Sequence, residues 1–298
     1  MKVGCYLFHM ERLRMHAPDE DVVLTEPPIF RIAPPREWWS LPCDELWNYR
    51  ELAYFLVWRD VKIRYKQTVI GAAWAVLQPL LTMAVFSLFF GKFAHIPSDG
   101  LPYPLFYYCA LLPWTYFSTA LQNTTNTIVD NQRLITKVYF PRLVLPLSSV
   151  ISGLVDFGVS FLMLVVLLVY YRISPTAAAL WLPAFLVLAI LSALGVGLWL
   201  AALNAIYRDV RYVLPFLIQF WMFASPVAYP SSLVPARWRW LFGLNPMTGV
   251  IEGFRWSLTR QGHAPGGLFF ASVTGVVVVL LSGVAYFQKM ETKIADVV

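Results

Sequence analysis

Charged side chains are scarce in this sequence. Of its 298 residues, only 13% are Asp, Glu, Lys or Arg, while 58% are hydrophobic and the mean hydropathy is +0.60. Soluble globular domains carry roughly 25% charged residues. A soluble fold could not bury so much apolar surface, so the composition excludes a soluble class and predicts an integral membrane protein.

Cysteine and histidine are also few, with three and four residues respectively. Cys5, Cys43 and Cys109 show no paired spacing, so neither a disulfide framework nor a metal site is predicted. A phosphate-binding loop of the form Gly-x-x-x-x-Gly-Lys-Ser/Thr is not found, since Gly91-Lys92 lacks the earlier glycine and the hydroxyl residue. We therefore expect no cofactor in this chain, so that any ATP chemistry would have to come from a partner chain.

The basic excess, a net charge of +6, does not indicate nucleic-acid binding. Lysines and arginines lie beside apolar runs and do not form one continuous basic face. Such a distribution is typical of contacts with anionic lipid headgroups. Membrane lipids, and no nucleic acid, are therefore expected among the partners.

Helical periodicity divides the chain into a tail, an amphipathic helix and apolar spans. Residues 1–43 are rich in proline and charge, and are predicted to form an extended cytoplasmic tail. From 44 to 68, apolar residues recur at helical spacing among charged ones, as in an amphipathic helix at a membrane surface. About 20 helical residues cross a bilayer core, so an all-α fold with six transmembrane helices is predicted. These spans cover about 70–90, 105–127, 143–171, 180–206, 213–229 and 267–287.

The Lys and Arg residues near the span ends set the expected orientation. With the N-terminus inside, twice as many of them lie in cytoplasmic segments as in periplasmic ones. We therefore expect a multi-pass protein of the bacterial inner membrane, with both termini in the cytoplasm.

One outer segment, 230–266, is too apolar for free solvent. It contains three tryptophans and several leucines and phenylalanines, interrupted by Asn245-Pro246. Non-helical backbone at membrane depth is tolerated only where it is buried in protein or lines a cavity. The segment therefore predicts two short re-entrant helices that form a periplasmic lid before the last span. A loop held at the interface by tryptophan anchors is the alternative.

Several motifs, in order along the chain, resemble a single family. The run Trp58-Arg-Asp-Val-Lys-Ile-Arg-Tyr-Lys-Gln-Thr-Val-Ile-Gly71, continued by Ala72-Ala-Trp-Ala-Val-Leu-Gln-Pro-Leu80, is similar to the start of ABC-2 type polysaccharide permeases. These are the membrane subunits that export O-antigen or teichoic acid. Further matches are Leu134-Ile-Thr-Lys-Val-Tyr-Phe-Pro-Arg142, Tyr207-Arg-Asp-Val-Arg-Tyr212, Ala224-Ser-Pro-Val-Ala-Tyr-Pro230 and Leu244-Asn-Pro-Met247.

This resemblance implies a homodimer that encloses a channel and is driven by a separate ABC ATPase subunit. The cargo it implies is a polyprenyl-pyrophosphate-linked polysaccharide of the O-antigen type, moved from cytoplasm to periplasm, and the chain itself would not be an enzyme. The alternative is an integral membrane transferase acting on a lipid-linked sugar. A transferase would need converging acidic or histidine side chains, whereas the outer histidines, His95 and His263, lie far apart in sequence.

The segment 128–142, between the second and third spans, is short and basic. The resemblance implies that it is a coupling segment, which docks into the ATPase subunit. A basic anchor paired with anionic lipid is the alternative. The residues predicted to make the coupling contact are Arg133, Ile135, Lys137, Tyr139, Phe140 and Arg142, with the apolar ones exposed.

The amphipathic helix is implied by the same resemblance to be a gate at the membrane entrance. Its basic face would meet the pyrophosphate of the lipid carrier, or would only fix the topology. Asp60 is expected to pair locally with a neighbouring cation. The predicted gate residues are Arg59, Lys62, Arg64, Tyr65 and Lys66.

Aromatic residues make up 16% of the sequence. Sugar rings present apolar C–H faces that stack on aromatic rings, so aromatics near span ends are predicted to line a glycan channel. Bundle packing and interfacial anchoring are the alternatives. The candidates are Trp74, Tyr107, Tyr108, Trp114, Tyr116, Phe117 and Trp221.

Three polar residues fall inside the predicted spans. An ionised carboxylate at the bilayer centre costs about 2.5–3.5 kcal/mol on insertion scales. Asp156 is therefore predicted either to hydrogen-bond another helix or to act in the channel or gate. Gln78 and Asn204 are predicted to form interhelical hydrogen bonds, and Gly195-x-Gly197 to be a site of close helix packing.

Overall fold

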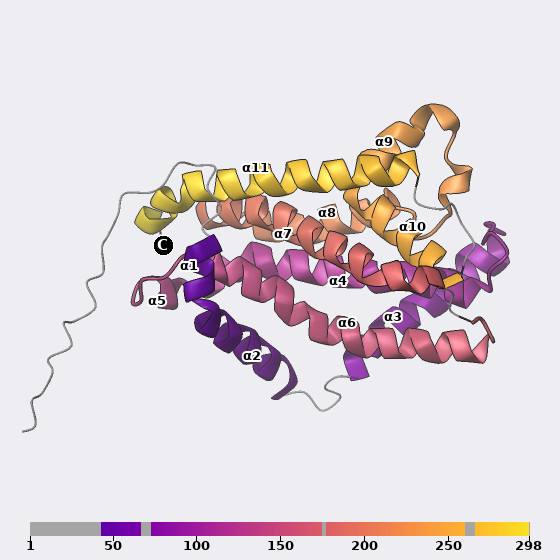
Figure 1. Ribbon diagram of the computed structural model, residues 1–298, viewed down its shortest axis with the longest axis horizontal. Helices are drawn as coiled ribbons and strands as arrows, with labels where there is room; N and C mark the ends of the chain where they lie inside the picture. Colours follow the sequence, from indigo (N-terminus) through magenta and orange to yellow (C-terminus); the bar gives the residue numbers. More distant parts are fainter. Residues whose placement is uncertain (1–42, 67–72, 175–176, 260–265, 298) are drawn as a thin grey trace, which may run out of the picture. The chain divides into compact units, whose positions relative to one another are not determined.

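Helices form the regular structure of this protein, and the part of the chain that the structure describes contains no strand (Figure 1). The all-α prediction is confirmed there. All described residues belong to one unit of the fold, Trp38–Val298. The predicted tail lies outside them, apart from Cys43. This computed structural model describes residues 43–66, 73–174, 177–259 and 266–297.

The predicted amphipathic segment consists of two successive helices. The short α1, Cys43–Asn48, is followed by α2, Arg50–Lys66. Leu56, near the middle of α2, is buried against the rest of the chain, and α2 packs along α6. Residues 67 and 68, which the prediction also included, lie outside the described ranges.

A helix lies at each of the six predicted spans. The first continues into a π-helical stretch, and the fourth begins with a 3₁₀ turn. The bounds are α3 Ala73–Phe86 with η1 Ser87–Phe93, α4 Tyr103–Asp130, α6 Val144–Tyr170, η2 Ala177–Trp181 with α7 Leu182–Ile206, α8 Val210–Phe223 and α11 Gly267–Val297.

Four of the described helices are long and apolar enough to cross a membrane. The second predicted span, α4, becomes polar after Asn123. The fifth, α8, has 14 residues and is therefore about 21 Å long, short of the bilayer core of about 30 Å. A multi-pass membrane protein follows from the four apolar helices, while six crossings stay a prediction. The four are Ala73–Phe93, Val144–Tyr170, Ala177–Ile206 and Phe269–Glu291.

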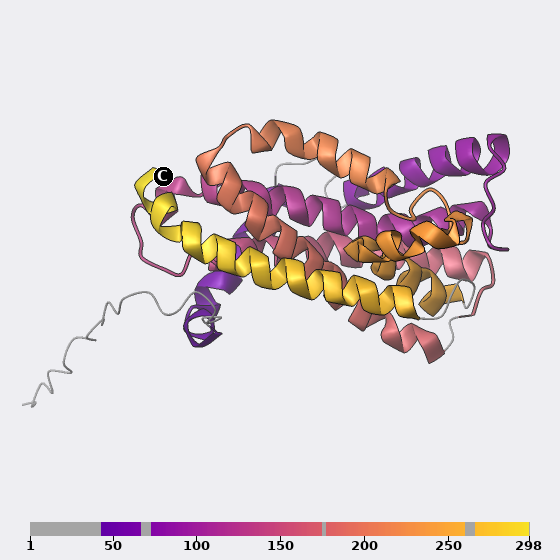
Figure 2. The same cartoon turned by 90° about the horizontal axis from the view of Figure 1, so that it is seen from above.

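The helix α4 contributes more buried residues than any other described helix and is packed against α3, α6, α7 and α10. Beside it, α11 runs along α7 (Figures 1 and 2). The two helices touch through glycines, because a Cβ on Gly283 would lie 2.4 Å from the carbonyl oxygen of Gly195. A Cβ on Gly197 would lie 2.6 Å from the Thr124 side chain of α4. The predicted close packing at Gly195-x-Gly197 is confirmed.

The segments predicted to be cytoplasmic gather at one end of this unit. There α1 and the short α5, Gln132–Ile135, lie near the last turns of α11 (Figure 1). The Arg142 guanidinium, just after α5, donates a hydrogen bond to the backbone carbonyl of Glu291 on α11. An ion pair of 3.0 Å joins Arg211 of α8 to Asp130 at the end of α4.

The predicted lid at 230–266 contains two short helices at the other end of the unit (Figure 1). Most of α9 is exposed, whereas α10 is largely buried against α4, α7 and α11. Ser272 of α11 holds the lid, since its hydroxyl donates to Gly243 O at 2.8 Å and accepts from Gly249 N at 3.1 Å. Entry of these helices into a membrane stays a prediction. The bounds are η3 Ser231–Leu233, η4 Ala236–Trp238, α9 Arg239–Leu244 and α10 Pro246–Thr259.

Candidate functional site

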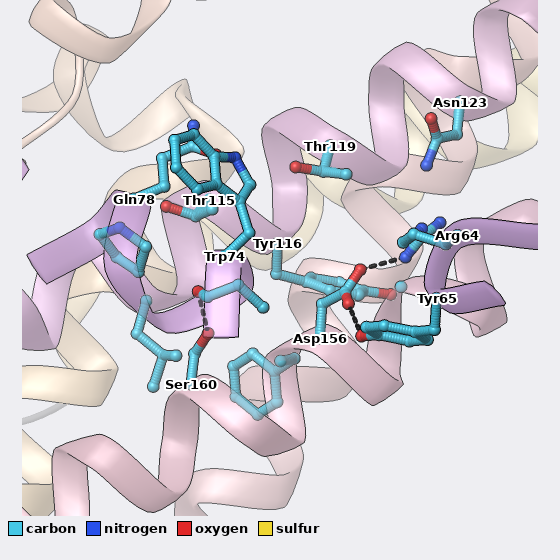
Figure 3. Close-up of a pocket in the computed structure, with 15 residues that line it drawn as sticks. Arg64, Tyr65, Trp74, Gln78, Thr115, Tyr116, Thr119, Asn123, Asp156 and Ser160 are labelled. Carbon is cyan, nitrogen blue, oxygen red and sulfur yellow. Dashed lines mark hydrogen bonds and ion pairs between the residues drawn. The ribbon is translucent and has the colours of Figure 1, made fainter. Parts of the chain in front are cut away.

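A cavity of about 610 Å³ lies between the C-terminal end of α2 and the helices α3, α4 and α6 (Figure 3). Its volume falls within the roughly 300–1,000 Å³ of small-molecule sites. The cavity collects members of three predicted groups, namely gate residues, channel aromatics and intramembrane polar residues. Its lining is Arg64, Tyr65, Trp74, Ala75, Gln78, Pro79, Leu112, Thr115, Tyr116, Thr119, Asn123, Gly153, Asp156, Phe157 and Ser160.

Asp156 extends from α6 toward the end of α2 (Figure 3). Its Oδ2 accepts a hydrogen bond from Arg64 Nη1, and its Oδ1 accepts one from the Tyr65 hydroxyl. Adjacent residues of α2 thus bind different oxygens of the same carboxylate. The prediction that Asp156 bonds to another helix is confirmed, and a part in gating stays a prediction.

The ion pair between Arg64 and Asp156 is only partly buried within the chain. The two side chains keep 28% and 23% of their surface exposed. Solvent screening limits pairs of this kind to about 0–1 kcal/mol of net stabilisation. A competing anion with more charge than a carboxylate could therefore displace Asp156 from Arg64.

Tyr65 stays protonated in this site. Burial raises the pKa of Tyr65 from 10.0 to about 12, and its hydrogen bond to the Asp156 carboxylate acts in the same direction. At neutral pH the phenol therefore remains a hydrogen-bond donor. It can hold an anionic oxygen without adding charge to the pocket.

Ser160 lies one helical turn beyond Asp156 on α6 (Figure 3). Its hydroxyl donates a hydrogen bond of 2.8 Å to Ala75 O, near the start of α3. Through these two side chains, α6 holds both the end of α2 and the start of α3. Both contacts line the cavity, so its shape depends on the position of α6.

Aromatic and neutral polar side chains share the lining of this cavity. Tyr116 and Phe157 meet edge to face, with ring centroids 5.8 Å apart, and Tyr116 is fixed by its hydroxyl donating to Val150 O at 3.1 Å. Thr119 and Asn123 supply neutral hydrogen-bonding groups. Aromatic faces beside amides and hydroxyls suit a sugar ring, and the Arg64 end suits an anion.

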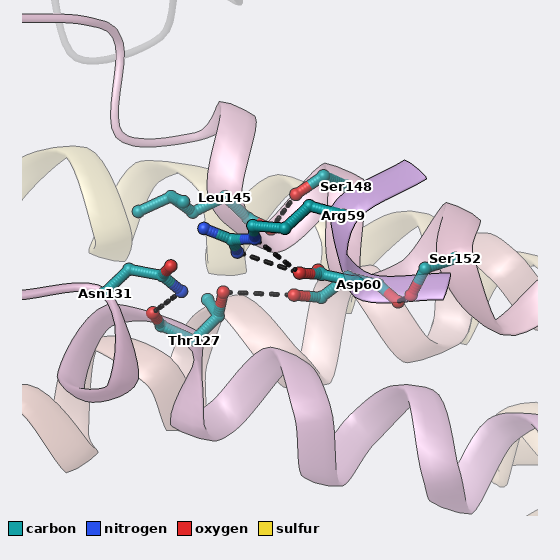
Figure 4. A network of polar contacts seen from close by, with 8 residues as sticks. Arg59, Asp60, Thr127, Asn131, Leu145, Ser148 and Ser152 are labelled. Carbon is teal, nitrogen blue, oxygen red and sulfur yellow. Dashed lines mark hydrogen bonds and ion pairs between the residues drawn. The ribbon is translucent and has the colours of Figure 1, made fainter. Parts of the chain in front are cut away.

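The other cations of α2 do not line this cavity. Arg59 pairs with its neighbour Asp60 at 2.8 and 3.0 Å, next to α6 (Figure 4), which confirms the predicted local pair. Lys62 and Lys66 are exposed. The prediction of one basic face is wrong, because Lys62 and Arg64, two residues apart, lie about 160° from each other around the helix axis.

Five of the seven predicted channel aromatics lie away from the cavity. Trp221 is half-buried, with its ring centroid 5.1 Å from that of Phe117. The four on α4 are packed in the core, as in the bundle packing that was the alternative, because α4 is covered on several sides. Contact with a glycan stays a prediction for all seven. The four core residues are Tyr107, Tyr108, Trp114 and Phe117.

Asn204 confirms its predicted interhelical role. Its side-chain amide, on α7, donates to Thr125 O at 3.0 Å and to Asn126 Oδ1 at 3.3 Å, both on α4. Gln78 instead is exposed at the cavity lining. The two residues, predicted alike from sequence, therefore have different surroundings.

The predicted coupling segment exposes a mixed basic and aromatic surface. Arg133, Lys137 and Tyr139 are exposed, the last with 87% of its surface. Ile135 is half-buried. Phe140, predicted to be exposed, is buried in a cluster with Leu56, so this part of the prediction is wrong. Contact with an ATPase stays a prediction for the segment, including Arg142.

Several lining residues were not selected from the sequence. Thr115, Thr119 and Asn123 recur every four residues along α4, and Ser160 follows Asp156 by four on α6. Polar residues with this spacing share one face of a helix. This four-residue spacing could therefore have predicted a polar face on α4. It was missed because the end of the second predicted span is polar at many positions.

The helices and this cavity define a class of protein, a multi-pass helical membrane protein with a substrate-sized pocket at the end of α2. The chain belongs to the ABC-2 type transporter family, whose profile matches residues 51–259. Prediction of this family from the motifs is confirmed.

Named relatives cover most of the chain. It is 32% identical over 257 residues to the O-antigen export system permease protein RfbA of Myxococcus xanthus, covering 85% of this chain and 97% of that protein. A protein of the same name from Klebsiella pneumoniae is 25% identical, covering 80% and 92%. The polysialic acid transport protein KpsM of Escherichia coli is 24% identical, covering 78% and 91%.

Proposed function

We propose that this chain is the permease subunit of an ABC exporter for a polysaccharide of the O-antigen type. The relatives are named as export permeases and transport proteins, and the likeness extends over nearly their whole length. Transport, not catalysis, is therefore the role of this chain. A separate ABC ATPase subunit binds ATP and Mg²⁺ and drives the cycle.

The cavity at the end of α2 carries the proposal about the form of the cargo. A polyprenyl-pyrophosphate-linked polysaccharide has an anionic headgroup next to its first sugar. Arg64 offers the cation, while Tyr116 and Phe157 offer rings and Thr119 offers a hydroxyl. The cation suits the pyrophosphate, and the aromatic rings and the hydroxyl suit the first sugar.

The arrangement of charges supports an orientation with both termini in the cytoplasm of the bacterium and the chain in its inner membrane. Arg133, Lys137, Arg142 and Arg211 lie in the segments that gather at one end, with α5 and the last turns of α11 (Figure 1). Lys and Arg concentrate on the cytoplasmic side of membrane proteins. In this orientation the lid, α9 and α10, faces the periplasm.

Two apolar faces support assembly into a homodimer. Leu81 of α3 and Phe89 of η1 are exposed, and α8 exposes Phe216 and Phe220. Lipid or a second copy of the chain must cover such surfaces. A dimer would place the cavities of two subunits in one translocation unit.

Reconstitution tests this function. Vesicles would contain this chain and its ATPase partner, with a labelled polyprenyl-pyrophosphate-linked glycan presented on the face that exposes the ATPase. Addition of ATP should move the label into the lumen, where an impermeant reagent cannot reach it.

Two controls define the outcome. Vesicles with an ATPase partner that binds but does not hydrolyse ATP should retain all label outside. Label that stays outside with an active partner would contradict export. Chemical conversion of the glycan without the ATPase would instead favour the integral membrane transferase.

A further inference from the structure

The carboxylate of Asp156 already occupies the place at Arg64 where an anionic ligand would bind. Arg64 contacts it through one nitrogen, Nη1, and both residues line the cavity (Figure 3). With the pair intact, the charges of Arg64 and Asp156 cancel. An anion that enters the cavity must therefore compete with Asp156 for the guanidinium.

The contact geometry allows this exchange without isolating the carboxylate. Arg64 binds Oδ2 of Asp156, whereas the Tyr65 hydroxyl binds Oδ1. When Arg64 turns away, the bond from Tyr65 to Oδ1 remains. The carboxylate is also not enclosed by the chain, since 23% of the Asp156 side chain is exposed.

We infer that Asp156 is a built-in competitor, which a phosphate group of the lipid-linked substrate displaces from Arg64 while Tyr65 retains the carboxylate. This inference rests on the proposed function. A guanidinium forms two parallel hydrogen bonds with a phosphate, whereas Asp156 receives one from Arg64. Pyrophosphate also carries more charge than a carboxylate, so the exchange favours the substrate.

The competitor has a consequence for release. An exporter must let its substrate leave, and a guanidinium without a competitor would retain a pyrophosphate. Here the return of Asp156 to Arg64 offsets part of the cost of losing the phosphate. Asp156 therefore lowers affinity and speeds dissociation, which distinguishes it from a residue that only holds the helices together.

The size of the cavity also limits how much of the substrate can bind there together with the phosphate. Beyond the ion pair the lining continues to Thr119, Trp74 and Gln78. A volume of about 610 Å³ has room for the phosphates and the first sugar of the glycan. The remaining sugars and the polyprenyl chain must lie outside it.

A binding titration without ATP tests the inference on the full chain in complex with its ATPase partner. The complex in lipid nanodiscs would be titrated with polyprenyl pyrophosphate, and the dissociation constant and dissociation rate measured. Asp156→Asn should tighten binding about three- to tenfold, with slower dissociation. Arg64→Gln should weaken it, and the double variant should show no gain.

Asp60→Asn is the matched control. Asp60 is as exposed as Asp156, 23% in both cases, and it also pairs with an arginine of α2. It does not line the cavity. Freeing Arg59 in this way should leave the dissociation constant unchanged. An equal gain in Asp60→Asn would show that added positive charge alone attracts the ligand, and would overturn the inference.

Tyr65→Phe gives a second test that leaves both charges in place and covers the case in which Asp156→Asn fails to fold. Without the hydroxyl, the displaced carboxylate loses its Oδ1 partner, so binding should weaken. Stronger or unchanged binding in Tyr65→Phe would contradict the retained contact. Size-exclusion profiles and thermal midpoints would establish that each variant is folded.

A bulk lipid phosphate is the other source of the same chemistry. Nanodiscs with phosphatidylglycerol, at the same negative charge as those with polyprenyl pyrophosphate, should show neither the gain in Asp156→Asn nor the loss in Arg64→Gln. Equal dependence on both residues would assign the site to ordinary lipid and overturn the inference. If wild type exports glycan and Asp156→Asn binds no more tightly, only the inference fails. If wild type exports nothing, the proposed function fails.

Discussion

The indole N–H of Trp221 donates a hydrogen bond to the side-chain oxygen of Asn245, 3.0 Å away. Asn245 stands between α9 and α10, and its oxygen also accepts from Met247 N at 3.1 Å. Its amide nitrogen donates to Ser225 Oγ at 2.9 Å and to Ala224 O at 3.2 Å. One side chain thus joins the end of α8 to both helices of the lid.

Asn245→Ala should destabilise the protein. The change removes four hydrogen bonds, each with a net value of about 0.5–1.5 kcal/mol, so a loss of about 2–4 kcal/mol is expected. The thermal midpoint, followed as the monodisperse fraction after heating, measures this. Asn48→Ala, at an exposed position of α1, is the control, and an equal midpoint for both variants would contradict the prediction.

Gly283→Ala should separate α7 from α11. The added Cβ would lie 2.4 Å from Gly195 O, a backbone atom that cannot turn away. Overpacking of this kind costs about 1–3 kcal/mol, measurable as a lower thermal midpoint. Gly158→Ala serves as the control, since nothing lies within 4 Å of its Cβ. That variant should be neutral or slightly stabilised, and a larger loss there than at Gly283 would refute the packing argument.

Charge reversal at Arg133 and Lys137 should uncouple transport from ATP hydrolysis. Arg133 lies on α5 and Lys137 just after it, and both side chains are exposed. Opposite charge there would repel a complementary ATPase surface. Transport should fall more than tenfold while the chain still inserts and its partner still hydrolyses ATP. Glycan uptake per ATP consumed in reconstituted vesicles measures the coupling.

Arg237→Glu is the control for that experiment. Arg237 is exposed on η4, near the lid, at the end of the helix bundle away from α5 (Figure 1). The same kind of charge reversal there should leave uptake per ATP unchanged. Normal coupling in the Arg133 and Lys137 variant would show that this segment is only a lipid anchor.

Single-cysteine labelling should place the two ends of the unit on opposite sides of the membrane. Tyr139→Cys and Ala94→Cys both sit at exposed positions, in a chain with Cys5 and Cys43 replaced by serine. An impermeant maleimide added to spheroplasts should label position 94 and reach position 139 only after lysis. Cys109 is fully buried and should stay unlabelled; early labelling at 139 would reverse the orientation.

The sequence predicted the helices well because apolar content and helical spacing are local properties. Each predicted span overlaps a helix, and the break at Asn245-Pro246 falls between α9 and α10. Asn204 was assigned correctly because a polar side chain in an apolar helix needs a partner. The partner itself, on α4, could not be read from the spacing.

The candidate site was predicted only in part, since it depends on contacts between distant segments. Arg64 and Asp156 were each selected, but in different roles, and 91 residues separate them in the chain. The burial of a side chain against a distant segment also could not be predicted from its neighbours in the sequence. Phe140 reads as a surface residue beside Arg142, yet it packs against a cluster that includes Leu56. Only the packing of α2 and α6 decides such outcomes.

The paired binding of Asp156 restricts how positions 64 and 156 can change during evolution. A chain that lost Asp156 alone would keep an unopposed guanidinium and release its cargo slowly. A chain that lost Arg64 alone would leave a carboxylate without its cation at the edge of the apolar spans, which is costly. If Asp156 competes as inferred, each single change should impair export, so natural selection should preserve the two residues together or remove them together across the exporters of this kind.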